Sequence, residues 1–331
     1  MKKNLLFALF TLLVMPLTVV AAGGRVIAGD GVEVSVFVSG SGITSIDLTT
    51  GNTRWRVLAD RQFHEPVLAG GQLLAAGSTG LYAIDPSSGE IGWMLADGTH
   101  FFPPVVVGGE VFVTNQSGMV RSVDLGTGEP RWQRLLGDGW LYPPAVIGSL
   151  LITGGQSAQL RALDRRTGEI VWQKHIGQEL VYSPVVVGNG RVVVTTFSGE
   201  VTALNAASGE ALWSRRFPSP SLSPVLIDGR LVIGSLGGVL RAIDPVNGKL
   251  IWRRKLESRL IAPVQGVGGR LLALTNDSHY HIVDSGSGQV ISRGLVSGEM
   301  VGGLLLSPTV GRIVTSGREG DLHLSEIHIG I

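Results

Sequence analysis

A short pattern that recurs about every 40 residues constrains this chain more than any other feature. It consists of a hydrophobic residue, an aspartate, three residues, a glycine and, four positions further on, a tryptophan. Its anchor residues lie 38 to 41 positions apart, at Asp47, Asp85, Asp124, Asp164, Asn205, Asp244 and Asp284, with a degraded eighth at Ser325. The tryptophans are Trp55, Trp93, Trp132, Trp172, Trp213 and Trp252, and Ser292 replaces the seventh. A fixed period of this length is the signature of a repeat architecture.

Each repeat predicts four short β-strands. The side chain of an Asp or Asn accepts hydrogen bonds from backbone amides just after it, and the glycine supplies the left-handed conformation that ends a short hairpin loop. Apolar and polar residues alternate on both sides of this turn, as in residues 160–163 and 170–174. Two further strands precede the turn. The first is headed by a proline, which lacks an amide donor and is tolerated at the start of a strand. These prolines are Pro66, Pro104, Pro144, Pro184, Pro224, Pro263 and Pro308.

Four-stranded antiparallel units at this period predict an all-β fold, an eight-bladed β-propeller. Eight units fit between Arg25 and Ile331; the first lacks a proline-headed strand and the last lacks much of its outer strand. We therefore expect one propeller domain over residues 23–331. The six repeated tryptophans are predicted to dock between neighbouring blades, because burial of an indole is strongly stabilising.

The first 22 residues are typical of a secretory signal peptide. Lys2 and Lys3 precede an apolar run from Leu5 to Val20, and small residues at Ala21 and Ala22 suit cleavage after Ala22. This predicts export to the periplasm. Cleavage would leave 25 basic and 26 acidic residues, so no general attraction to nucleic acid is expected. With 44% hydrophobic and 16% charged residues the chain is globular rather than disordered.

The repeat resembles the tryptophan-docking motif of propellers related to pyrroloquinoline quinone enzymes. Residues 162–172, ALDRRTGEIVW, carry it in full, and residues 83–93 and 242–252 repeat it closely. Within that group the size, the signal peptide and the Ser-Pro-Val-Val strand are most similar to the BamB family. The resemblance implies a non-enzymatic scaffold in the Gram-negative periplasm that binds protein partners, the outer-membrane β-barrel assembly machinery among them.

Two features depart from that family. The family's lipoproteins carry a cysteine at the signal cleavage site, and residues 19–23 contain none, so any membrane association is expected to be indirect. The stretches before two of the proline-headed strands, 218–223 and 258–262, are also shorter than the family's partner-gripping loops.

No catalytic, cofactor or metal residues are predicted. The chain has no cysteine and none of the phosphate-cradling or nucleophile-elbow motifs, and its repeated aspartates are accounted for by turns. His279 and His281 lie two apart beside Asp277, a spacing that suits two metal ligands on one strand. His281 occupies the repeat position of Arg161 and Arg241, however, so a solvated surface histidine is the preferred interpretation.

The residues that lead into the proline-headed strands carry the candidate partner site. His100, Phe101, Trp140 and Tyr142 are the predicted partner-binding residues, because exposed aromatic side chains are enriched at binding hot spots. These stretches are expected to share one face with the loops near Ser78, Gln116, Gln156 and Ser198, around the mouth of the central channel. The residue two before each proline is large and is predicted to belong to the blade core: His64, Phe102, Tyr142, Tyr182, Leu222, Ile261 and Leu306.

The sequence therefore predicts a periplasmic scaffold that binds protein partners and catalyses nothing. A quinone-binding or quinone-dependent oxidoreductase stays open as one alternative. A sugar-binding or cell-wall-binding propeller that uses the aromatic residues is the other.

The basic residues that follow the tryptophans are predicted to protect exposed sheet edges rather than to bind anions. They are Arg56, Arg134, Lys174, Arg215, Arg216, Arg253, Arg254 and Lys255.

Overall fold

The structure is a computed structural model that describes residues 25–29, 32–39, 42–47, 50, 52–64, 66–137, 139–177, 181–182, 184–219, 221–296, 300–307, 312–317 and 322–326. For the strands within 25–39 and 300–326 only the backbone is described. The predicted signal peptide, residues 1–22, and Pro308 lie outside these ranges.

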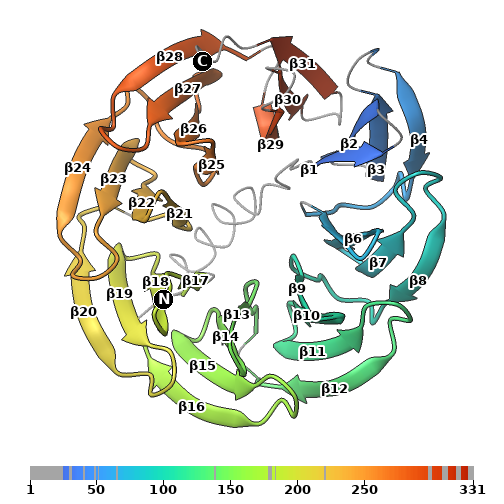
Figure 1. The fold of residues 1–331 in the computed structure, drawn as a ribbon, viewed down its shortest axis with the longest axis horizontal. Helices are drawn as coiled ribbons and strands as arrows, with labels where there is room; N and C mark the ends of the chain where they lie inside the picture. The colour runs from blue at the N-terminus through green and yellow to red at the C-terminus, as the bar shows by residue number, and fades with distance from the viewer. Residues whose placement is uncertain are drawn as a thin grey trace, which may run out of the picture.

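The described strands form a ring of antiparallel sheets around a common axis (Figure 1). Seven sheets have four strands, and the sheet nearest the C-terminus has three, β29 to β31. Consecutive strands are neighbours in every sheet, so each blade is an up-and-down meander. This confirms the all-β class and the propeller arrangement. Within the described residues the last blade lacks the outer strand, as the degraded eighth repeat predicts.

The strands of each blade run from the ring axis to its outer wall (Figure 1). The innermost strands are β1 (Arg25–Gly29), β5 (Val67–Ala69), β9 (Val105–Val107), β13 (Ala145–Ile147), β17 (Val185–Val186), β21 (Val225–Ile227), β25 (Gln265–Val267) and β29 (Met300–Ser307). The second strands are β2 (Val32–Ser39), β6 (Gln72–Gly77), β10 (Glu110–Thr114), β14 (Leu150–Gly154), β18 (Arg191–Thr195), β22 (Arg230–Gly234), β26 (Arg270–Thr275) and β30 (Arg312–Gly317).

The third strands end at or just before the anchor residues, and the fourth strands carry the tryptophans. The third strands are β3 (Gly42–Asp47), β7 (Gly80–Ile84), β11 (Met119–Asp124), β15 (Gln159–Asp164), β19 (Glu200–Asn205), β23 (Val239–Ile243), β27 (His279–Asp284) and β31 (Leu322–Glu326). The fourth strands are β4 (Thr53–Val57), β8 (Ile91–Leu95), β12 (Pro130–Leu135), β16 (Ile170–His175), β20 (Ala211–Arg216), β24 (Leu250–Lys255) and β28 (Val290–Leu295).

The repeated Asp and Gly close the turn between the third and fourth strands. In one such turn Asp164 Oδ1 accepts hydrogen bonds from the amides of Arg166 and Thr167, both at 2.9 Å. These hydrogen bonds lower the pKa of Asp164, because they favour its charged form. The Gly168 amide donates to the Asp164 carbonyl at 2.8 Å, and Gly168 has a φ of +71°, which a side chain would disfavour.

Each repeated indole docks on the following blade. The Trp132 indole N–H donates to the Arg165 carbonyl at 2.8 Å, and its ring covers Gly168, where a Cβ would come within 2.5 Å of the ring. The same pair of contacts occurs at Trp55, Trp93, Trp172, Trp213 and Trp252, each with the carbonyl after the next anchor and the glycine of the next turn. The indoles therefore lie between blades, and the glycine is required by this close approach.

The core lies between neighbouring sheets rather than in one centre. Where side chains are described, the second and third strands are buried along almost their whole length, whereas the fourth strands are largely exposed apart from the indoles. One buried cluster joins Leu81 and Ala83 of β7 to Val111 of β10, across two blades. The basic residues predicted for outer edges do lie on the fourth strands, from Arg56 on β4 to Lys255 on β24.

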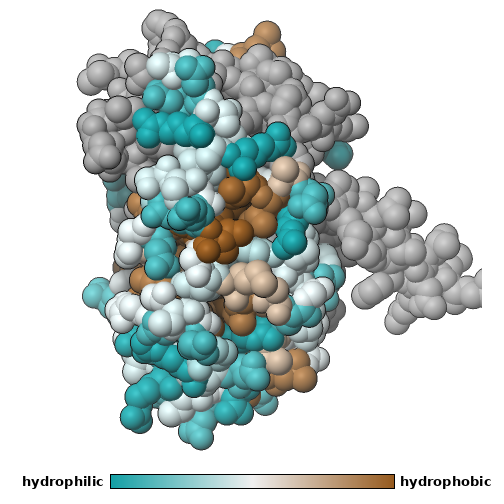
Figure 2. Space-filling view, turned by 90° about the vertical axis from the view of Figure 1, so that its right-hand side faces the viewer, coloured by the Kyte–Doolittle hydropathy of each residue, from teal (hydrophilic) through white to brown (hydrophobic). Residues whose placement is uncertain are grey.

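The outer wall also exposes apolar side chains. Figure 2 shows an apolar patch among hydrophilic residues on the side of the ring that includes β8. On β8 itself, Ile91 and Met94 are 44% and 64% exposed. Within the described residues, no helix is long and apolar enough to span a bilayer.

Candidate functional site

The segments that lead into the innermost strands lie on one face with the loops between the second and third strands. The Gln116 amide donates to the His100 carbonyl at 2.8 Å, and the Gln156 amide donates to the Trp140 carbonyl at 3.1 Å. The Ser78 amide bonds to the Gln62 carbonyl in the same way. The predicted sharing of one face by these loops is thus confirmed where the structure describes them.

Where the structure describes it, the residue three before each proline is buried, whereas the predicted core position, two before, is buried only at Phe102 and Leu222. An isolated β-bridge pairs Phe101 with Asn115, and another pairs Leu141 with Gly155. Phe101 and Leu141 are both 0% exposed. Phe63, Val181 and Leu260 are buried in the same way. The expectation that Phe101 presents an exposed aromatic ring is therefore wrong, because its side chain points into the core.

The residues two before each proline instead line up around the inner ends of the blades. Phe102 and Leu222 are buried, whereas His64, Tyr142, Tyr182 and Ile261 are only half-buried. Leu306 belongs to a strand of which only the backbone is described.

Rings at this position touch from blade to blade. The centroid distances are 5.5 Å from His64 to Phe102, 5.5 Å from Phe102 to Tyr142 and 5.7 Å from Tyr142 to Tyr182. His100 and Trp140, four before their prolines, add rings 5.4 Å and 6.2 Å from Phe102. We call these six residues the aromatic arc: His64, His100, Phe102, Trp140, Tyr142 and Tyr182.

The two histidines of the arc face each other. Their Nε2 atoms are 2.6 Å apart, a distance that needs one ring to donate and the other to accept. Burial lowers the pKa of His64 to about 3, with a further contribution from the charge of His100, and burial also lowers the pKa of His100. Both rings are therefore neutral at pH 7. Burial likewise raises the pKa of Tyr142 to about 12, so the arc carries no charge at neutral pH.

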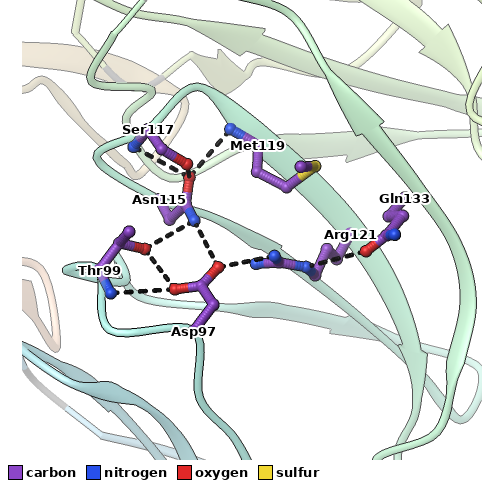
Figure 3. A network of polar contacts seen from close by, with 7 residues as sticks. All are labelled: Asp97, Thr99, Asn115, Ser117, Met119, Arg121 and Gln133. Atoms are coloured by element: carbon purple, nitrogen blue, oxygen red, sulfur yellow. Dashed lines mark hydrogen bonds and ion pairs between the residues drawn. The ribbon is translucent and has the colours of Figure 1, made fainter.

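A polar network fixes the segment that carries His100 and Phe102 (Figure 3). Asp97 accepts hydrogen bonds from Arg121 at 2.6 Å and from the Asn115 side chain at 3.1 Å. It also caps the amide of Thr99 at 3.0 Å. The pKa of Asp97 is lowered: burial opposes ionisation, but the hydrogen bonds from Thr99 and Arg121 outweigh it. The network ties this segment to β11, the third strand of the next blade.

Three of the four predicted partner-binding residues thus come together: His100, Trp140 and Tyr142. His64, Phe102 and Tyr182 share the repeat position of Tyr142 but are not among the predicted partner-binding residues. That shared position is the signal that would have placed them in the arc.

The interpretation of His281 as a solvated surface residue is wrong. Its side chain is 2% exposed, and its Nε2 lies 3.2 Å from the Thr275 hydroxyl. The repeat position that it shares with Arg161 and Arg241 is buried in every blade whose side chains are described there. His279 bonds to Asp277 instead. No set of three or more potential metal ligands occurs within the described residues.

Comparison with known protein families identifies the family of this chain. The profile of the outer membrane protein assembly factor BamB family matches residues 39–141, 156–233 and 198–318, which is most of the chain. The chain belongs to the BamB family. A search of curated proteins gave no match.

Solved structures share the fold. BamB from Moraxella catarrhalis aligns with a TM-score of 0.70 and 18% identity, over 91% of this chain and 95% of that one. The computationally designed protein Ika8 aligns with a TM-score of 0.78 and 12% identity, over 92% of this chain and 96% of that one. At these identities the similarity concerns the fold alone.

Proposed function

We propose that the protein is a non-enzymatic periplasmic scaffold that binds protein partners in outer-membrane β-barrel assembly. Membership of the BamB family supports this role, and the predicted signal peptide over residues 1–22 supports the compartment. The mature chain, residues 23–331, forms one domain in this proposal, an eight-bladed ring that closes between the sheets β1 to β4 and β29 to β31. Any contact with the membrane is then indirect.

The aromatic arc is the observation that carries the proposal. It joins four neighbouring blades into one uncharged surface, with Trp140, Tyr142 and Tyr182 half-buried at its exposed side. Aromatic residues supply large contact areas at little cost in side-chain entropy, and they dominate binding hot spots. The Asp97 network holds this surface in place before a partner arrives, which lowers the entropic cost of binding.

A pull-down from a Gram-negative envelope tests the proposal. The wild-type chain should recover components of the barrel-assembly machinery, and Trp140→Ala should lower that recovery at least tenfold. Met94→Ala, which removes an exposed apolar residue from the outer wall, is the matched control and should leave recovery unchanged. Recovery of a different stable partner in place of these components would reject the assembly role.

A sugar-binding or wall-binding function is the second candidate, because half-exposed aromatic rings also stack on sugars. Saturable binding of peptidoglycan fragments that Trp140→Ala abolishes, with the fold intact, would favour it over the protein-binding role. For a quinone-binding oxidoreductase, the test is incubation with pyrroloquinoline quinone and calcium. Cofactor absorbance retained after gel filtration would contradict the proposal that the chain catalyses nothing.

A further inference from the structure

One buried position of the repeat, in the third strand of each blade, holds a charged residue in several blades. It lies three residues before each anchor, and its occupants are Thr44, Tyr82, Arg121, Arg161, Thr202, Arg241 and His281. At Arg121 and Arg241 the side chain is 8% and 5% exposed. A guanidinium cannot lose its charge at physiological pH, so burial demands compensation from its neighbours.

Around Arg121 the chain supplies that compensation. The Asp97 carboxylate lies 2.6 Å from Nη2, and Nε donates to the Gln133 side chain directly opposite on β12. Asp97 comes from the segment that follows the outer strand of the preceding blade, four residues after Trp93. At Arg121, therefore, a carboxylate is the partner of the buried guanidinium.

Around Arg241 both of those neighbours are replaced. Phe217, four residues after Trp213, takes the place of Asp97, and the Arg241 guanidinium lies 4.7 Å from the centre of its ring. Arg253 takes the place of Gln133, directly opposite on β24. Like charges directly opposite on adjacent strands repel. Burial, and then the charge of Arg253, lower the pKa of Arg241.

The Arg241 guanidinium is left incompletely bonded. The Nη1 atoms of Arg121 and Arg241 are both buried without a hydrogen-bond partner, but Arg121 has its ion pair with Asp97. No carboxylate forms an ion pair with Arg241 or Arg253 in the described part of the chain. Lys255 projects from the same face of β24 as Arg253, two residues further along, and both are exposed. Lys255 Nζ donates to the Gly237 carbonyl at 2.6 Å, which neutralises no charge. We call Arg241, Arg253 and Lys255 the cationic site.

We propose that the cationic site binds an acidic side chain of a protein partner, whose carboxylate takes the place that Asp97 has beside Arg121. This deepens the proposed scaffold function and rests on it. In this proposal a single carboxylate binds Arg241 beside Phe217, and the exposed Arg253 and Lys255 attract it electrostatically. A flat anionic membrane would contact the two exposed cations only. Charge-assisted bonds to guanidinium are among the strongest that a carboxylate makes.

The test uses purified mature protein and a capped tetraglutamate peptide as the probe, with binding measured by calorimetry at about 0.15 M ionic strength. We expect saturable binding with one peptide per chain. Arg253→Ser and Arg241→Thr should each weaken it at least tenfold. Thr202 occupies the position of Arg241 in the preceding blade, so threonine is compatible with the fold there. Arg166→Ser, which removes one exposed positive charge from a distant turn, should leave binding unchanged.

Three results would overturn the proposal: no saturable binding, equal weakening by Arg166→Ser, or tighter binding of inorganic phosphate than of the peptide. Adsorption to phosphatidylglycerol vesicles that these variants abolish, without peptide binding, would overturn it as well. The peptide assay needs no physiological partner. A failed pull-down therefore rejects the assembly role without touching this site, and a failed peptide assay rejects the site alone.

Discussion

Replacement of Trp252 by alanine tests the claim that the indoles hold neighbouring blades together. Trp252 is the most buried of the six, at 9% exposed, and its N–H donates to the Ser285 carbonyl at 2.9 Å. A buried indole removes roughly 200 Å² from water, which at about 25 cal/mol/Å² is worth about 5 kcal/mol. The alanine side chain retains part of this burial energy, whereas the cavity left by the indole adds to the destabilisation. We therefore expect the free energy of unfolding to fall by about 4 kcal/mol.

Urea unfolding followed by circular dichroism measures this change, as a lower midpoint at an unchanged slope. The variant should still fold, because Ser292 already takes the place of a tryptophan in the next blade. Trp252→Phe keeps most of the ring and loses the hydrogen bond, so it should cost about 1 to 2 kcal/mol. A loss below about 1 kcal/mol for Trp252→Ala, as at an ordinary surface site, would refute the docking role.

Three further changes follow from the same contacts. Gly168→Ala places a Cβ 2.5 Å from the Trp132 ring at a φ of +71°, and should lower the free energy of unfolding by about 3 kcal/mol in the same urea assay. Asp97→Asn leaves the buried Arg121 without its carboxylate and should cost about 2 kcal/mol at pH 7. Because the pKa of Asp97 is lowered in the folded chain, this difference should shrink in melting curves as the pH falls below about 4. His64 is neutral when folded, with a pKa of about 3, so wild-type stability should fall as the pH drops from about 6.5 towards 3, and His64→Phe should flatten that part of the curve.

Each of these changes has a control or a contrary outcome. Gly148→Ala has a φ of +58° and no heavy atom within 4 Å of the added Cβ, so it should lose only about 1 kcal/mol. Equal losses at Gly148 and Gly168 would mean that backbone conformation, not the indole, sets the cost. A stability loss for Asp97→Asn that grows as the pH falls below about 4, or an unchanged acid limb for His64→Phe, would contradict the assigned pKa directions.

The repeat predicts the ring because its chemistry is local and periodic. Asp164 and Gly168 define a turn through groups a few residues apart, and the same offsets recur in every blade. The partner of Trp132 is equally regular, since the next turn follows about 36 residues later in the sequence. Because the period of the repeat is fixed, this contact between distant residues can be predicted from the sequence alone.

The errors concern residues whose environment depends on contacts between segments that are distant in the sequence. Phe101 and Phe102 are adjacent aromatic residues, and a single-residue bridge to Asn115 decides which of them points into the core. The alternation of apolar and polar residues in this segment is too short to show which of the two rings is in the core. A polar residue such as His281 suggests exposure, yet it occupies a repeat position that is buried in the described blades. His64 meets His100 across 36 residues of sequence, where nothing in the repeat predicts a histidine pair.

The direction of the indole contacts has a consequence for how the chain acquires its shape. Each of the six repeated indoles donates to a carbonyl 31 to 34 positions nearer the C-terminus. While the chain emerges N-terminus first from a ribosome or a translocation pore, the tryptophan of the most recently completed blade has no docking site yet. We therefore expect the blades to dock one after another, because each newly emerged turn supplies the docking site for the tryptophan of the preceding blade.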